Sequence, residues 1–417
     1  DGLFFPDRTP HSGAKQMKNC YRPVRCRKIA DNRYQFFNHN YFENAVLSVK
    51  YTYFTNGVET YSSTFDVNIA PQSSQEYEID SLELEKDNHN SVVFEYLAGD
   101  FLIASEQIIL SEGKLSADIN SGGKTTVKPS ENKLYITFDN GSMIFDKSTG
   151  FITSYIYKNH EMINSFPLGD FKGFAPAFYR APLDNDRNIC KYWHTMGLQN
   201  TSNICKGSSF TDNGDNIVVT TNIKSIANCI LPVANTQIKY TIYPNGNILV
   251  DVNCLGGGAV KLLPRFGVML EMPKEYENIK YFGLGEDVNL PDYKEHTINK
   301  IYQTTVDKLK EDYIKPQESA TRCDVRFAEI TNASGFGLRF EAVSKPFVFS
   351  ASHYTSNQWA KAMHRDDLVD LPTTCVNIDS SVLGAGSNAC GPLPDKKDRV
   401  GSLSGKKLSF VVKPIGE

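Results

Sequence analysis

The sequence predicts an all-β protein built from a small β-sandwich followed by a large antiparallel β-sandwich. The chain has 417 residues, which is too long for one ordinary hydrophobic core and indicates two or three domains. Short apolar runs alternate with polar residues at a period of two, which is typical of half-buried strands. Turn signals such as Asn-Gly separate these runs. The regular alternation of strands and helices that builds a barrel or a Rossmann domain is missing.

The first predicted domain spans residues 1–110. Its first 30 residues are rich in turn and breaker residues and are expected to form an irregular lead-in. In the run at 45–54, Val49, Tyr51 and Tyr53 alternate with polar residues, and a tight hairpin is expected at the following Asn-Gly. Other strands are predicted at 34–37, 64–69, 91–96 and 103–110. Short strands with no convincing helix between them indicate a sandwich of immunoglobulin-like size.

The second predicted domain spans residues 133–417. It follows a linker at 111–132, where large apolar residues are few and Ser, Gly, Lys and Thr are common. Its clearest hairpin pairs 134–139 with 142–146. Further strands are predicted at 151–157, 217–223, 237–243, 247–253, 261–271, 279–284, 324–330, 335–340, 347–351, 376–378 and 408–412. This number of strands exceeds the usual size of one sheet, so a two-sheet sandwich is expected.

Two short helices are predicted in this domain, at 189–196 and 356–363, and Thr355 or Ser356 is expected to be the N-cap of the second. His353 and His364 flank this second helix. A catalytic Ser/His or Cys/His arrangement would need a carboxylate partner that the sequence does not place, so a capped helix is the preferred interpretation.

The amino-acid composition limits which partners the protein can bind and in which cellular compartment it is expected. The net charge is −4 and no long basic run occurs, which argues against a nucleic-acid partner. No stretch of about 18 apolar residues exists, so no membrane span is expected. The nine cysteines form no CxxC pair, which argues against a zinc site and favours free thiols in a reducing, cytoplasmic compartment. The start at Asp1, without Met or a signal peptide, is interpreted as a cut inside a longer chain or a processed end.

A polar loop interrupts the strands at 178–186, with the sequence FYRAPLDND. Charged groups in a Pro-stiffened loop between apolar strands are costly to bury unless they bond one another. Such a loop is either a structural knot or part of a site. Asp184 and Asp186 are therefore expected to bond Arg180 and backbone amides.

Four segments resemble the C-terminal part of the large bacterial β-galactosidases of glycoside hydrolase family 2. They are, in the order of the family, DGLFFPDRTP at 1–10 with YRPV at 21–24, FYRAPLDND at 178–186, YFGLGEDVNLPD at 281–292 with YIKPQE at 313–318, and NIDSSVLGAGSNACGP at 377–392. Two departures from the family pattern concern local loops. Glu286 and Asp287 replace a Pro-Glu pair and are expected to be solvated or to brace their loop, and an Asn-Gly turn after 316–318 is lost.

The resemblance implies an immunoglobulin-like linker domain and a terminal supersandwich domain similar to galactose mutarotase. It also implies hydrolysis of terminal β-D-galactosides such as lactose by a retaining mechanism. In the family, both catalytic carboxyls and the Mg and Na ions lie on the barrel. This chain is thus expected to lack the catalytic residues and any cofactor, to be inactive alone, and to complete the active-site mouth and a homo-oligomer with the missing N-terminal barrel portion.

The same resemblance supplies the candidate substrate-binding residues. In relatives one loop of the terminal domain reaches the active-site mouth, and an aromatic residue or Cys there contacts the substrate. The matching residue is Cys390, with Asn388 and Ala389 beside it; its thiol cannot offer the flat face that a Trp gives a sugar. In some relatives the segment after RAPLDND is a mobile loop at the same mouth, which makes Arg187 and Asn188 further candidates. Trp193, just beyond them, is expected to lie in the core.

Two alternative functions remain open at this point. One is a stand-alone carbohydrate-binding module with a mutarotase-like fold, which predicts galactoside binding without the barrel. The other is a mutarotase or epimerase, which needs a His/Glu acid–base pair in the cleft of the sandwich. His296 is the His nearest to a motif for that role.

Overall fold

The structure is a computed structural model that describes residues 2–115, 117, 119, 122–163 and 173–416. Asp1, on which the expectation of a cut end rests, lies outside the described residues, as do 116, 118, 120 and 121 of the predicted linker. The chain divides into two compact units. The first contains residues 1–114, 282–287 and 293–302, and the second contains 115–281, 288–292 and 303–417.

The first unit contains two antiparallel sheets, in agreement with the predicted sandwich. One has the strand order β1-β2-β5 and the other β4-β3-β6-β7. The elements of residues 1–114 are α1 (Ser12–Cys20), β1 (Val24–Lys28), β2 (Arg33–Asn38), β3 (Ala45–Thr55), β4 (Val58–Ile69), β5 (Ser74–Glu78), β6 (Asn90–Ala98) and β7 (Phe101–Ser111). The five predicted strands are confirmed. The lead-in is not irregular throughout, because it forms α1 and β1.

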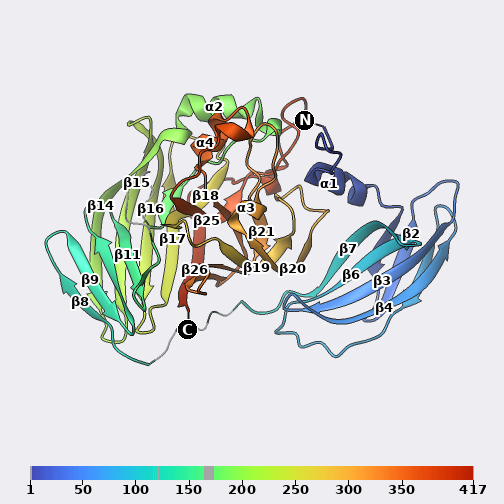
Figure 1. Cartoon of the computed structure of the whole chain (residues 1–417), viewed down its shortest axis with the longest axis horizontal. Helices are drawn as coiled ribbons and strands as arrows, with labels where there is room; N and C mark the ends of the chain where they lie inside the picture. The colour runs from blue at the N-terminus through green and yellow to red at the C-terminus, as the bar shows by residue number, and fades with distance from the viewer. Residues whose placement is uncertain (1, 116, 118, 120–121, 164–172, 417) are drawn as a thin grey trace. The chain divides into compact units, whose positions relative to one another are not determined.

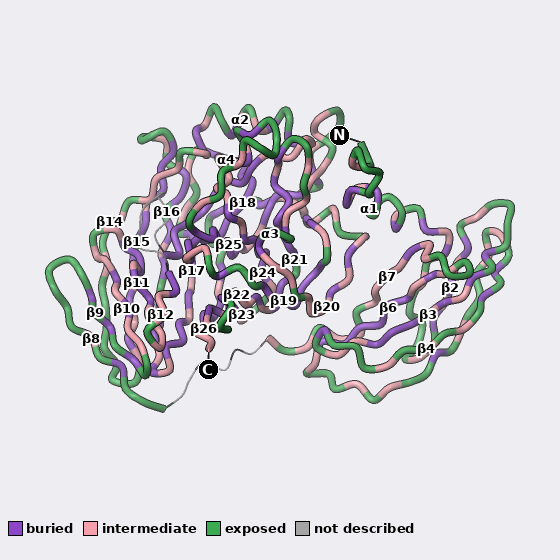
Figure 2. The backbone as a smooth tube through the Cα atoms, viewed as in Figure 1, coloured by how far each residue is buried: buried purple, intermediate pink, exposed green. Residues whose placement is uncertain are grey.

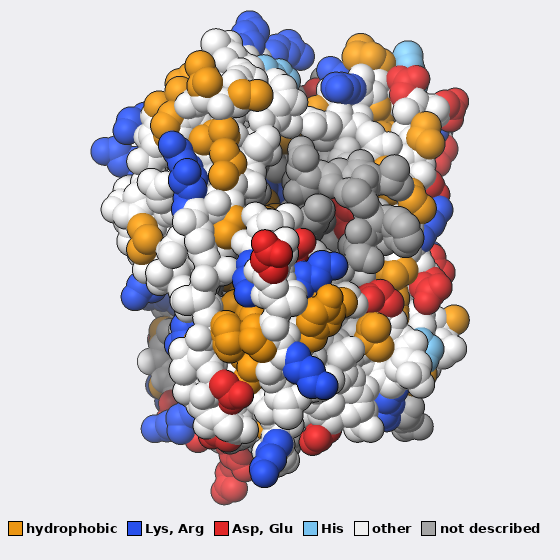
Figure 3. Space-filling view, turned by 90° about the vertical axis from the view of Figure 1, so that its left-hand side faces the viewer, with side chains coloured by type: hydrophobic (Ala, Val, Ile, Leu, Met, Phe, Trp, Pro, Cys, Tyr) orange, Lys and Arg blue, Asp and Glu red, His pale blue; other side chains and the backbone are white. Residues whose placement is uncertain are grey.

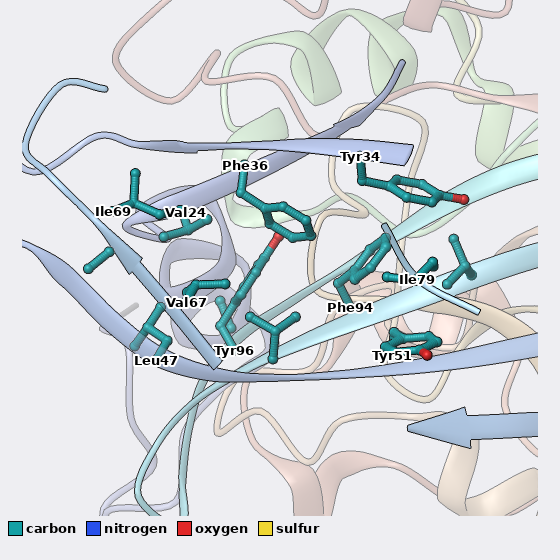
Figure 4. Close-up of a cluster of buried hydrophobic side chains, with 14 of the residues drawn as sticks. Val24, Tyr34, Phe36, Leu47, Tyr51, Val67, Ile69, Ile79, Phe94 and Tyr96 are labelled. Carbon is teal, nitrogen blue, oxygen red and sulfur yellow. The ribbon is translucent and has the colours of Figure 1, made fainter. Parts of the chain in front are cut away.

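Aromatic side chains fill the core between these two sheets (Figure 4). Phe36 of β2 meets Phe94 and Tyr96 of β6 edge to face, at ring-centroid distances of 5.4 and 6.4 Å. Val49 and Tyr51 of β3 are also buried there, as their alternation with polar residues predicts. Each buried aromatic ring removes a large apolar area from water, so this small sandwich has a substantial core of its own.

Three further sheets contain the remaining strands (Figure 1). Their orders are β12-β11-β10-β9-β8, β13-β18-β25-β24-β21 and β14-β15-β16-β17-β26-β23-β22-β19-β20. The strands are β8 (Thr126–Pro129), β9 (Lys133–Phe138), β10 (Gly141–Asp146), β11 (Phe151–Tyr157), β12 (His160–Glu161), β13 (Ala175–Ala177), β14 (Thr201–Asp212), β15 (Ile217–Ala227), β16 (Leu231–Ile242), β17 (Ile248–Gly257), β18 (Arg265–Pro273), β19 (Asn278–Gly285), β20 (Ile298–Thr305), β21 (Arg322–Val325), β22 (Phe327–Thr331), β23 (Gly337–Ala342), β24 (Phe347–Ser352), β25 (Thr373–Val382) and β26 (Lys407–Ile415).

Short helices connect these strands: α2 (Ile189–Met196), α3 (Val306–Leu309) and α4 (Ser356–Lys361), with 3₁₀ turns η1 (Asp184–Asp186), η2 (Leu198–Asn200), η3 (Arg365–Asp367) and η4 (Lys396–Asp398). The bounds of α2 are those predicted. Thr355 is the N-cap of α4, where its side chain accepts a hydrogen bond from the backbone N–H of Gln358. The prediction of an all-β, antiparallel fold is confirmed. The strands β8 to β26 form three sheets, whereas two were expected.

Most buried residues lie in strands, whereas many of the connections and some edge strands, such as β14, are exposed (Figure 2). A ring contact of 6.1 Å between Phe145 of β10 and Tyr240 of β16 packs the β8–β12 sheet against the nine-stranded sheet. On the face shown in Figure 3, basic, acidic and hydrophobic side chains are interspersed. Among the described residues, no helix is long and apolar enough to cross a membrane.

Candidate functional site

The 178–186 loop is built around a buried ion pair. Arg180 Nη1 lies 2.7 Å from Asp186 Oδ2, and both side chains are almost completely excluded from solvent. The same carboxylate oxygen accepts the backbone N–H of Leu183 at 2.8 Å. The guanidinium also lies over the ring of Trp193, whose indole N–H donates to the carbonyl of Leu262. The expected bonding of Asp186 to Arg180 and a backbone amide is thus confirmed, and Trp193 is a core residue.

Side-chain amides join this loop to the loop that carries Cys390. Asn185 Nδ2 donates to the carbonyl of Gly386 at 2.6 Å, and Asn188 Nδ2 donates to the carbonyl of Asn388 at 2.7 Å. The structure therefore brings together two candidate segments that are about 200 residues apart in the sequence. Arg187 is exposed beside Asn188, and its guanidinium makes no hydrogen bond or ion pair with a described residue.

Asp292 fixes the start of the Cys390 loop. Its carboxylate accepts the backbone N–H groups of Ala385 at 2.6 Å and Gly386 at 2.9 Å. A Cβ atom at position 384 would lie 2.5 Å from Asp292 Oδ1, so only Gly384 allows this approach. Asp292 ends the motif segment YFGLGEDVNLPD, but the sequence alone predicts no role for it. Its position in a motif was the only hint in the sequence that Asp292 has a structural role. Its hydrogen-bond partners could not be predicted, because they lie more than 90 residues away.

The tip of this loop is a tight turn that exposes Cys390. The backbone N–H groups of Cys390 and Gly391 donate to the carbonyl of Ser387 at 3.0 and 2.6 Å, and Ser387 N–H donates to the carbonyl of Pro392 at 3.1 Å. Asn388 and Ala389 are half-buried, whereas Cys390 is exposed. The loop therefore presents a small thiol on a braced backbone, a surface suited to contact rather than to stacking.

A third motif segment bonds to the same loop system. Gln317 Oε1 accepts the backbone N–H of Asp184 at 2.8 Å. Three of the four quoted motif segments therefore meet the FYRAPLDND loop or the Cys390 loop through direct hydrogen bonds. This convergence gives the motifs a common structural role that their separation in the sequence conceals.

A cluster of buried polar side chains lies where strands β18, β24 and β25 run side by side. Arg265 Nη2 lies 3.1 Å from Asp379 Oδ2, and Arg265 Nη1 donates to Asn377 Oδ1 at 2.9 Å. Apart from this contact with Arg265, the carboxylate oxygens of Asp379 have no polar partner among the described residues. Burial raises the pKa of Asp379 to about 7; Arg265 opposes this shift and Glu318 adds to it. Such a carboxyl changes its charge near neutral pH.

The other residues singled out from the sequence do not take part in the contacts between the FYRAPLDND and Cys390 loops described above. Asp287 pairs with Lys15 at 2.7 Å, which confirms its loop-bracing role. Nδ1 of His296 lies 2.8 Å from the Oε1 atom of Gln16, in the first unit rather than in a cleft of the large sandwich. His353 is buried and contacts the carbonyl of Thr373, and His364 is exposed.

No group of three or more His, Cys, Asp or Glu side chains that could hold a metal ion occurs in the described part of the chain. All nine thiols are free.

Comparison with known proteins places this site in a family. The family model described as "Beta galactosidase small chain" matches residues 137–412. A β-galactosidase of Actinobacillus pleuropneumoniae is 30% identical over 410 residues, which cover 94% of this chain and 39% of that protein. A β-galactosidase of Staphylococcus xylosus is 24% identical and is covered to 40%. The chain thus spans about two fifths of the length of these curated relatives.

Among solved structures, a galactose 1-epimerase from Lactobacillus acidophilus NCFM aligns with a TM-score of 0.41 at 8% identity, over 71% of this chain and 99% of that one. The family match covers most of the chain and includes the FYRAPLDND and Cys390 loops and Asp292. The resemblance to β-galactosidases is confirmed, and the chain belongs to the β-galactosidase small chain family.

Proposed function

We propose that this chain is the non-barrel, C-terminal part of a β-galactosidase that hydrolyses terminal β-D-galactosides such as lactose with retention of configuration. The observation that carries this proposal is the pattern of coverage: proteins named β-galactosidase match about nine tenths of this chain, but the chain covers only about two fifths of them. The larger remainder of such an enzyme is the natural place for the catalytic groups.

In this proposal the chain contributes residues that border the active site, and the remaining, larger part of the enzyme (the larger portion) contributes the catalytic residues. A retaining glycosidase needs two carboxyls about 5–5.5 Å apart, one as acid/base and one as nucleophile. Asp186 is not suited to either role, because it is buried against Arg180 and committed to a backbone N–H. The larger portion then provides both carboxyls and any Mg or Na ion.

The Cys390 loop is the proposed contact with the substrate. Asp292 and Asn188 hold its backbone from two sides, so the exposed Cys390, with Asn388 and Ala389, can border the active-site mouth on the leaving-group side. Arg187 would lie at the same border with a free guanidinium. The small thiol leaves space where a bulkier residue would stack on the leaving sugar.

The partners of the proposed enzyme are the galactoside, the larger portion, and further copies in a homo-oligomer. The nine free thiols suit a reducing compartment such as the cytoplasm.

The test is an o-nitrophenyl-β-galactoside assay of this chain alone, of the larger portion alone, and of the two mixed. We expect turnover only in the mixture, and a lower kcat/KM in a mixture that contains Cys390→Gly. Robust turnover by this chain alone would reject the proposal, because a carboxylate pair would then have to exist within it.

A further inference from the structure

Two neighbouring aromatic residues, Tyr41 and Phe42, project from the loop that joins β2 to β3 in the first unit. Tyr41 is 74% exposed and Phe42 is 95% exposed. Their rings lie beside each other, with centroids 6.3 Å apart. Single exposed apolar residues are common on protein surfaces, but two adjoining rings that the rest of the chain leaves uncovered are typical of a contact surface.

The buried side chain of Asn38 fixes the backbone on both sides of the two rings. Its Nδ2 atom donates to the carbonyl of Glu43 at 3.0 Å and to the carbonyl of Ile69 at 2.9 Å. Its Oδ1 atom accepts the backbone N–H of Asn40 at 2.9 Å. Because Asn38 is fully buried, loss of these bonds would leave polar groups without partners. One side chain therefore ties the residue before the rings to the residue after them.

The turn at 70–73 holds the start of the same loop. The backbone N–H of Gln72 donates to the carbonyl of Asn40 at 3.1 Å, and Gln72 Nε2 donates to the carbonyl of His39 at 2.8 Å. The backbone N–H of His39 donates to the carbonyl of Pro23, just before β1, at 2.8 Å. The loop thus presents its two rings on a fixed backbone. A surface that is already ordered loses little conformational freedom when it binds a partner.

Further apolar side chains are exposed at the same end of this sandwich. Val46, near the start of β3, is 66% exposed. Phe101, at the start of β7, is also 66% exposed. Phe101 pairs with Ala98 of β6, and β6 pairs with the first half of β3, so the start of β7 lies at the end of the sheet where β3 begins. The two rings therefore have apolar neighbours that can border a docked partner.

The larger portion of the proposed enzyme is the partner that fits this surface. Residues 38–46 include Glu43 and neither Lys nor Arg, so the loop lacks the positive charge that accompanies exposed aromatic residues at nucleic acids and anionic membranes. A two-fold contact between two copies of the chain would set the same protruding rings against each other.

The length of the relatives supports the same choice. The match covers 39% of one curated relative and 40% of another, so about three fifths of each lies outside it. In these relatives the remainder belongs to the same protein as the matched region. Two parts joined in this way meet at a high effective concentration, which favours a stable contact between them.

We propose that Tyr41 and Phe42 anchor this chain to the larger portion of the β-galactosidase by inserting their rings into an apolar hollow on that portion. This inference rests on the proposed function, which defines the larger portion. A few buried aromatic residues provide most of the binding energy in many protein interfaces. The two rings are therefore expected to determine the affinity between the two portions. The proposed contact with the substrate belongs to a different loop, that of Cys390.

The experiment measures the dissociation constant between the 417-residue chain and the larger portion. Sedimentation velocity gives it directly, and o-nitrophenyl-β-galactoside turnover titrated against chain concentration gives it a second time. Wild type is compared with the double variant Tyr41→Ser/Phe42→Ser and with Val58→Ser. Val58 is the matched control, because it is 55% exposed at the opposite end of the β3–β4 pair. All three replaced side chains are exposed, so both variants are expected to fold, and thermal unfolding checks this.

We expect the double variant to bind about thirtyfold more weakly than wild type, and Val58→Ser to bind within about twofold of wild type. At a saturating chain concentration the double variant should restore wild-type turnover, because only assembly is affected. Equal affinities of wild type and the double variant would overturn the proposal, as would a wild-type chain that does not bind the larger portion. Self-association that the double variant loses, with unchanged affinity for the larger portion, would also overturn it and assign the rings to a contact between two copies.

The two readouts separate this proposal from that of the β-galactosidase function. Binding that depends on Tyr41 and Phe42, in a mixture without turnover, would reject the function and retain the anchor. Turnover in a mixture whose affinity does not depend on the two rings would reject the anchor and retain the function.

Discussion

The side-chain amide of Asn188 donates a hydrogen bond of 2.7 Å to the backbone carbonyl of Asn388, two residues before Cys390. This bond joins the segment after FYRAPLDND to the tip of the Cys390 loop. Two residues chosen separately from the sequence thus prove to be direct partners. Because the bond is exposed, it restrains the loop without contributing much to global stability.

Asn188→Ala should loosen the Cys390 loop and spare the fold. An exposed hydrogen bond contributes about 0.5–1.5 kcal/mol, so we expect kcat/KM of the complemented β-galactosidase to fall about threefold to tenfold with little change in Tm. Asn357→Ala is the matched control, because Asn357 makes the same kind of bond to the carbonyl of Gln199. Equal losses of activity in both variants would contradict a specific role for Asn188.

Asp292→Asn should disorder the first turn of the same loop. Asp292 accepts two backbone N–H groups, whereas Asn has one acceptor and would direct its NH₂ group at the other N–H. Losing a charge-assisted bond and opposing two donors should cost about 1–3 kcal/mol locally. Hydrogen exchange at Ala385 and Gly386 is the measurement, and faster exchange at these two amides is expected. Unchanged protection there would show that the loop is held by other contacts.

The sequence predicted best where a strand or helix carries its own signal. The helix at 189–196 was predicted with its correct bounds, because apolar residues recur at helical spacing before a glycine, Gly197, which adopts a left-handed conformation. β3 was predicted because one of its faces lies in the core and the other does not. Local pattern and tertiary environment agree in such segments.

Elements were missed where their surroundings in the fold leave no regular alternation of apolar and polar residues in the sequence. β14 was missed because it is the edge strand of its sheet and is largely exposed on both faces, so its residues show little alternation. α1 was missed because Pro10 lies just before this helix and Gly13 lies in its first turn, and both residues usually mark turns. The role of Asp292 could not be predicted, because its partners Ala385 and Gly386 lie more than 90 residues away in the sequence and approach it only in the folded chain.

Gly384→Ala should destabilise the second unit near the Cys390 loop. A Cβ atom there would lie 2.5 Å from Asp292 Oδ1, so the carboxylate would have to move away from the two amides it binds. Overpacking of this kind costs about 1–3 kcal/mol. Denaturant unfolding should show a lower midpoint. Gly256→Ala is the control, because nothing lies within 4 Å of the added methyl group in β17; a similar loss in that variant would rule out the clash as the cause.

Stability should depend on the ionisation of Asp379. Burial raises the pKa of this carboxyl from 3.8 to about 7, although Arg265 opposes the shift. Because the folded-state pKa is the higher one, the contribution of Asp379 to stability is fully present below about pH 3.8 and is lost as the pH rises through about 7. The loss can reach about 1.4 kcal/mol per pH unit within that window.

Asp379→Asn replaces the titrating carboxyl with a neutral group of similar shape and resembles its protonated form. Wild type should therefore lose unfolding free energy relative to the variant between pH 4 and pH 7, by about 1–3 kcal/mol in urea titrations. Asp215→Asn, in an exposed turn, should show no such difference. If wild type instead gains stability relative to Asp379→Asn as the pH rises, the 3.1 Å pairing with Arg265 outweighs burial, and the pKa of Asp379 is lowered rather than raised.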